Sequence, residues 1–337
     1  MNRTDSDTDV PCPWDQFARV LTDLAANPSD WELRKKEALC IAALAHVAPD
    51  GTAIAPGYFE DRHGNRINAL VMERALGEIA TLLNERSDPE LLAKQADLTA
   101  KLEDGADEQA RPRWLEKLNL QLKAWMVAKA TLEQINDAPT ILHSTRSGDV
   151  TRDVSDWFTE LAPSLKAAGF SLASPFENVA NTERMGQHRG QLWVHSDPRV
   201  ALIAEAVPGV RLVLVISRLS NGTILVTGNN LGGFFHTAGP VLDGFAVFPG
   251  TPVAEMVRLH SALLARRLAG LAGVSALPIL NLAHLAAAEN HMRTQRTAFR
   301  RRVGLTDAEV RGMPVKHHAY FAKKLKAKVA RRLAAGA

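Results

Sequence analysis

The sequence predicts an α+β protein: an all-helical N-terminal domain, then an antiparallel meander sheet flanked by helices, then basic C-terminal helices. Three observations lead to this expectation. Apolar residues recur at helical spacing through the first third of the chain. Short β-branched runs in the middle are separated by only a few turn residues, too few for a parallel crossover. The last 45 residues hold 13 Lys or Arg and two acidic residues.

Changes in composition divide the chain into four segments. The N-terminus is polar, acidic and aperiodic, which is typical of disorder, whereas the segments that follow have helical or strand periodicity. The predicted segments are 1–12 (disordered), 13–136 (helical domain), 137–275 (α+β domain with the antiparallel sheet) and 276–337 (basic helical tail).

The helical domain opens with a predicted amphipathic helix over 13–26. Ser29 and Glu32 form a capping box, which predicts Ser29 as the N-cap of a second helix that ends near Val47. Turn residues over 51–67 then predict a loop or a short hairpin.

Three further helices are predicted in this domain, over 69–84, from Ser87 to about Leu102, and from Pro112 to about Ile135. The last is the longest. Its apolar residues predicted to face a core are Trp114, Leu118, Leu122, Trp125 and Val127.

The sheet module is organised around the stretch 211–230, in which two β-branched runs flank a Ser-Asn-Gly turn. We expect Asn221 and Gly222 to adopt positive φ in a hairpin there. Amphipathic helices over 149–168 and 251–271 precede and follow the sheet, and we expect helices to pack on one of its faces. The predicted strands are 139–143, 170–172, 191–195, 199–207, 212–219, 223–227 and 245–248, and the segment 174–190 is predicted to be irregular.

Several functional classes find no support in the sequence. The two cysteines, Cys12 and Cys40, form no CxxC pair and have no ligand-spaced histidine, so neither a disulfide framework nor a metal site is expected. No dinucleotide, P-loop, kinase, zinc-protease or GxSxG signature occurs, and we expect no cofactor. The start does not resemble a secretory signal, and no apolar run reaches the ~18 residues of a spanning helix. A cytoplasmic protein is therefore the expectation.

The strongest functional feature is the positive charge near the C-terminus. Clustered Lys and Arg attract polyphosphate backbones and anionic lipid headgroups. The alternative is a solvated face that packs on the acidic remainder of the chain. The predicted anion-binding residues are Arg296, Arg300, Arg301, Arg302, Lys316, Lys323, Lys324, Lys326, Lys328, Arg331 and Arg332.

Two weaker candidates lie in the sheet module. The glycine-rich loop after the hairpin presents Asn229, Asn230, Gly232 and Gly233, whose amides are candidates for binding a small anion or a carbonyl. His195, Asp197 and His236 are candidate catalytic residues, because a general base requires an orienting carboxylate.

The sequence thus favours a non-catalytic binding or scaffold protein whose basic C-terminal helices contact an anionic partner: nucleic acid, an acidic protein or a membrane face. The oligomeric state is left open. The alternative is an enzyme of unknown reaction, with a pocket near His195, Asp197 and the loop 229–236.

Overall fold

The fold is taken from a computed structural model of the 337-residue chain. The structure describes residues 13–45, 58–60, 66–104, 114–135, 139–145, 151–179, 182–183, 188–207, 209–229, 242–247, 251–306, 310 and 317–334. The predicted disorder of 1–12 lies outside these residues.

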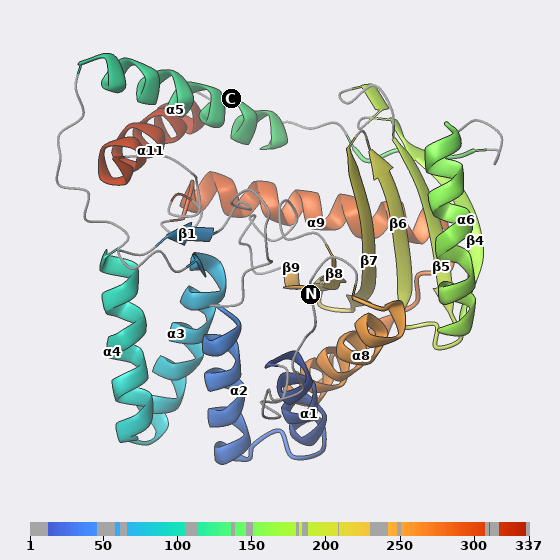
Figure 1. Cartoon of the computed structure of the whole chain (residues 1–337), viewed down its shortest axis with the longest axis horizontal. Coiled ribbons are helices and arrows are strands. Elements are labelled where there is room, and N and C mark those ends of the chain that lie inside the picture. Colours follow the sequence, from blue (N-terminus) through green and yellow to red (C-terminus); the bar gives the residue numbers. More distant parts are fainter. Residues whose placement is uncertain are drawn as a thin grey trace, which may run out of the picture.

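The architecture is α+β, as the sequence predicts. N-terminal helices lead into a largely antiparallel sheet, and further helices follow it (Figure 1). The N-terminal elements are α1 (Pro13–Ala26), α2 (Trp31–Leu44), the hairpin of β1 (Tyr58–Glu60) and β2 (Arg66–Asn68), α3 (Ala69–Glu85), α4 (Pro89–Asp104) and α5 (Trp114–Ile135).

The main sheet has eight strands in the order β3–β4–β5–β6–β7–β8–β9, with β10 paired to the end of β7. Every pairing is antiparallel except that of β8 with β9, which is parallel. The strands are β3 (Leu142–Ser144), β4 (Phe170–Asn178), β5 (Arg189–His195), β6 (Ala201–Val207), β7 (Val210–Leu219), β8 (Ile224–Gly228), β9 (Leu242–Ala246) and β10 (Ala276–Leu277).

Helices cover both faces of the sheet, so the expectation of one covered face is wrong (Figure 1). Leu202 and Ala204 of β6 belong to the core cluster that includes α6 (Arg152–Ala167), α8 (Val253–Gly270) and α1. The alternate residue Ile203 belongs to a second cluster.

The second face is covered by α9 (Leu282–Val303). Its first turns carry apolar residues, including Leu285 and Ala288, and these pack on the sheet before the helix becomes basic. In the sequence this helix falls in the predicted basic tail, because the charge of its second half obscures the apolar first half. The last helix is α11 (His318–Ala334).

Two details of local structure differ from the expectations. Asp30, not Ser29, is the N-cap of α2, and its carboxylate accepts a hydrogen bond from the backbone N–H of Leu33. In the β7–β8 turn, Gly222 has φ of 88°, whereas Asn221 does not adopt positive φ. The Asn221 side chain instead accepts a hydrogen bond from the N–H of Thr223.

Gly222 also contacts the helix on the far face. A Cβ added there would lie 2.1 Å from Nε2 of His291, so the replacement Gly222→Ala adds a clash to backbone strain. We expect it to lower the free energy of unfolding by about 2–3 kcal/mol. Gly209→Ala is the control, because Gly209 has φ of 76° with no atom near the Cβ position. It should cost about 1 kcal/mol by urea denaturation. Equal losses would argue against the contact with His291.

The long helix α5 buries a different face from the one that the sequence predicts. Its buried residues are Leu120, Ala124 and Ala128, which contact α11 with partly buried Val127 beside them. The predicted core residues are instead exposed: Trp114, Leu118, Leu122 and Trp125. The prediction chose the wrong face because α5 is apolar on two faces.

Within the part of the chain that the structure describes, no helix combines the length and the apolar character needed to cross a bilayer.

Candidate functional site

The described basic residues near the C-terminus lie on two helices, α9 and α11. In Figure 1, α5 and α11 lie side by side at one corner of the molecule, and α9 runs from the sheet toward them. Leu305, just after α9, packs into the same core as Phe321 of α11. We call the following exposed and half-buried cations the cationic surface: Arg301, Arg302, Lys323, Lys324, Lys328, Arg331 and Arg332.

In the described residues, no salt bridge joins a side chain of the cationic surface to a carboxylate. Two of them contact aromatic rings. The Arg332 guanidinium lies 5.8 Å from the ring centre of Trp125, and the Lys324 ammonium lies 5.4 Å from that of Tyr320. These contacts orient the cations without supplying a negative charge, and no carboxylate of the described residues supplies one either.

Other predicted anion-binding residues lie elsewhere. Arg300 is 5% exposed and donates a hydrogen bond to the carbonyl of Gly304. Burial lowers the pKa of Arg296, and the charges of Arg300 and Arg293 lower it further. These arginines therefore belong to the packed side of α9. Lys326 lies on α11 but already interacts with another group of the protein, so it is not counted in the cationic surface, and Lys316 lies outside the described residues.

The structure does not join His195 and Asp197 as a catalytic pair. The backbone N–H of Asp197 donates to Nδ1 of His195, whose ring packs on Phe170. The carboxylate of Asp197 pairs with Arg199 at 2.7 Å, which lowers the pKa of this carboxyl. His236 lies outside the described residues.

Part of the predicted ligand loop has a structural role. The side-chain oxygen of Asn229 accepts a hydrogen bond from the N–H of Val213 and extends the β7–β8 pairing by one residue. Asn230, Gly232 and Gly233 lie outside the described residues.

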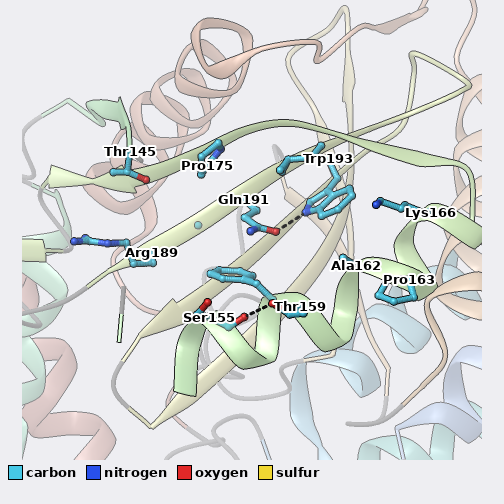
Figure 2. A pocket seen from close by; sticks show the side chains of 13 residues that line it. Thr145, Ser155, Thr159, Ala162, Pro163, Lys166, Pro175, Arg189, Gln191 and Trp193 are labelled. Carbon is cyan, nitrogen blue, oxygen red and sulfur yellow. Dashed lines mark hydrogen bonds between the residues drawn. The ribbon is translucent and has the colours of Figure 1, made fainter. Parts of the chain in front are cut away.

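A cleft lies between α6 and strands β4 and β5, with a volume of about 710 Å³ (Figure 2). Its apolar walls include Phe158, Leu172 and Trp193. Figure 2 shows Arg189 at one end and Lys166 at the other. The remaining polar lining residues are Thr145, Ser155, Thr159 and Gln191.

Two hydrogen-bonded pairs fix polar groups in this cleft. The indole N–H of Trp193 donates to the side-chain oxygen of Gln191 at 3.0 Å (Figure 2). Arg189 pairs with Glu177 of the neighbouring strand at 2.8 Å. An apolar floor with the cation Lys166 at one end suits a small amphipathic anion, whereas the charge of Arg189 at the other end is already balanced by Glu177.

This cleft was not predicted from the sequence. Arg189, Gln191 and Trp193 alternate along β5, so they share one face of the strand. From that alternation, the sequence could have predicted that these three side chains line one surface of the sheet. The pairing of this face with α6 is not local in the sequence, and β4 continues through Pro175 past a bulge, in a region predicted to be irregular.

A second unpredicted feature is a polar cluster between the sheet and α9. His188 is fully buried, and its Nδ1 accepts a hydrogen bond from the N–H of Asn178. Its Nε2 therefore carries the proton and donates to Glu205 at 3.3 Å. A ring nitrogen held in this way is not available as a general base.

Glu289 of α9 extends this cluster. Burial raises its pKa to about 8, and the negative charge of Glu205 adds to the shift, while a hydrogen bond from Thr140 opposes it. In the unfolded chain a glutamate titrates near 4.3. Between these two values the folded state binds more protons than the unfolded state, so stability must fall as pH rises through this window.

We expect the free energy of unfolding to fall by about 4 kcal/mol between about pH 5 and about pH 8.5 because of Glu289. The neutral variant Glu289→Gln should remove this part of the pH dependence. Urea midpoints of both proteins across the range measure it. Parallel pH profiles would contradict the assignment to Glu289.

His260 of α8 forms a third buried polar group. Its Nε2 lies 2.9 Å from the hydroxyl of Ser217, and its Nδ1 lies 3.1 Å from that of Thr227. The Ser217 hydroxyl donates to the carbonyl of Arg199 at 2.6 Å, so it accepts from the histidine. The serine is therefore not activated as a nucleophile. This network provides hydrogen-bond partners for the buried side chains of His260, Ser217 and Thr227 between α8 and the sheet.

Among the described residues, no group of three or more His, Cys, Asp or Glu is placed to hold a metal ion. Comparisons with known proteins give no further guide: no protein-family model, no curated protein and no solved structure matches this chain.

Proposed function

We propose that this protein is a non-catalytic binding protein whose cationic surface contacts an anionic partner. One observation carries the proposal: the seven cations of this surface have no carboxylate ion pair within the described residues. Elsewhere in the same structure, cations are commonly paired, as Arg34 is with Glu85 and Lys35 with Asp88.

The composition of α11 supports the same proposal. The helix carries six Lys or Arg and no acidic residue, whereas its apolar residues are used to pack on α5. Repulsion between these cations costs stability in the isolated protein and is relieved when phosphate groups approach. An anionic partner explains why such a charge distribution is tolerated.

The test measures binding to two anionic probes in parallel. One is a labelled DNA duplex, followed by fluorescence anisotropy, and the other is a vesicle of phosphatidylcholine with phosphatidylglycerol, followed by co-sedimentation. We expect binding to at least one probe, with an affinity that falls steeply as salt is added. Failure to bind either probe at low salt would overturn the proposal.

The cleft beneath α6 supports a second candidate function, the binding of a small amphipathic anion. The observation that favours it is the apolar floor of Leu172 and Trp193 with Lys166 and Arg189 at its ends. The enzyme alternative remains a prediction from sequence, because part of its proposed site lies outside the described residues.

Decanoate is a suitable probe for the cleft, because it joins an apolar chain to one carboxylate. In isothermal titration calorimetry, we expect Leu172→Asp to abolish binding and Lys166→Gln to weaken it about fivefold. Arg152→Gln removes an exposed charge at the other end of α6 and should change nothing. Binding that survives Leu172→Asp would place the ligand elsewhere.

A further inference from the structure

The helix α5 has two apolar faces, and the described part of the chain covers only one of them. Leu120, Ala124 and Ala128 face α11 and are buried. On other sides of the helix, Trp114, Leu115, Leu118, Leu122, Trp125 and Met126 are exposed, and we call these six residues the apolar stripe.

The exposure of this stripe is large. The exposed fraction is 72% for Trp114, 64% for Leu118 and 56% for Leu122. Half of the large apolar side chains that are exposed in the described residues belong to this one helix. A contiguous apolar surface of this kind marks a binding face.

The stripe meets the cationic surface at Trp125. Arg332 of α11 and Lys129 of α5 both lie 5.8 Å from the ring centre of this tryptophan. Nearby, the side-chain amide of Gln121 donates a hydrogen bond to the hydroxyl of Tyr320. The ammonium of Lys324 lies over the ring of the same tyrosine. Aromatic residues, leucines and cations are therefore continuous over the α5–α11 pair.

The charge of this pair decides between possible occupants. Together α5 and α11 contain nine Lys or Arg and two Glu. A second copy of the same face would bring these positive charges against one another, which disfavours self-association. A nucleic acid would engage the cations and leave the leucines in water. An anionic bilayer suits both the apolar stripe and the cationic surface, because tryptophan and leucine enter the interface while the cations contact the lipid phosphates.

We propose that the α5–α11 pair docks this protein on the surface of an anionic lipid bilayer, with the apolar stripe inserted at the interface. This inference rests on the proposed function and names its partner. It requires no spanning helix, because an interfacial helix lies in the plane of the membrane.

The test uses full-length protein and vesicles of phosphatidylcholine, with or without phosphatidylglycerol. Wild type should co-sediment with the anionic vesicles and not with the neutral ones. The double variant Leu118→Ser/Leu122→Ser should bind anionic vesicles about tenfold more weakly or worse. Both leucines are exposed, so the folded state should be retained, which circular dichroism checks.

The matched control is Leu92→Ser/Leu280→Ser, which removes two leucines that are 48% and 44% exposed outside the stripe. It should bind as wild type does. If the stripe variant also binds as wild type, the inference is overturned.

A duplex DNA arm separates the two proposals. Binding to DNA without binding to vesicles would overturn the membrane inference and keep the proposed function, whereas binding to neither would overturn both. A dimer in sedimentation equilibrium that the stripe variant abolishes, without vesicle binding, would assign the stripe to a second copy and overturn the inference.

Discussion

Neutralising four cations of α11 should lower the affinity for an anionic partner by up to about a thousandfold, since each basic residue near such a surface contributes about 1 kcal/mol. The variant replaces Lys323, Lys324, Lys328 and Arg331 with glutamine. None of these has a carboxylate ion pair in the described residues, so none of the described carboxylates loses a partner. Stability should rise slightly or stay the same, because like charges are removed.

A matched control variant has the same change in net charge, but the four replaced cations lie elsewhere on the protein. It replaces four exposed cations that lie outside both the cationic surface and the cleft: Arg19, Lys36, Arg86 and Arg152. Co-sedimentation with anionic vesicles and anisotropy with duplex DNA compare the two proteins. The control should lose less than about threefold through its general charge. Equal losses in the two variants would mean that only net charge matters and that α11 has no special role.

Truncating Phe321 to alanine should cost about 3–5 kcal/mol of unfolding free energy, the largest loss that we expect from a single side chain here. Phe321 is fully buried, and it packs with Leu325 of α11 against Leu120 and Ala124 of α5. Removing the ring opens a cavity at the contact that holds the two helices together.

Urea denaturation followed by circular dichroism measures this loss, and Phe321→Leu is the control. Leucine retains most of the buried volume, so we expect a cost below about 1.5 kcal/mol. The alanine variant should also bind anionic vesicles more weakly, because α11 no longer presents its cations beside the apolar stripe. A cost below about 1 kcal/mol for alanine would show that this helix contact contributes little to stability.

Local signals in the sequence predicted much of the fold. Helical periodicity located the N-terminal helices, and the short connections at Pro208-Gly209 and Asn221-Gly222 correctly predicted antiparallel neighbours. The strand predicted at 245–248 lies at Leu242–Ala246 and pairs in parallel with β8. A parallel pairing is not encoded by a turn, so no local pattern indicated it.

The errors share a physical cause: a pattern gives the apolar faces of an element but not the neighbour that each face meets. In α5 the smaller residues Ala124 and Ala128 face α11, whereas the larger Leu118 and Leu122 are exposed. Periodicity alone favours the larger side chains as core residues. The cleft under α6 was missed for a related reason, because its walls come from segments that only the tertiary fold brings together.

The most direct test of the cationic surface is lysine acetylation with mass spectrometry, carried out on wild-type protein. Anionic vesicles, with duplex DNA in parallel, are compared with neutral vesicles. We predict that at least one anionic probe protects Lys324 and Lys328 several-fold from acetylation. Lys36 of α2 should react at the same rate throughout. Equal reactivity of all three lysines in the presence of a bound anionic partner would contradict the assignment of the binding surface to α11.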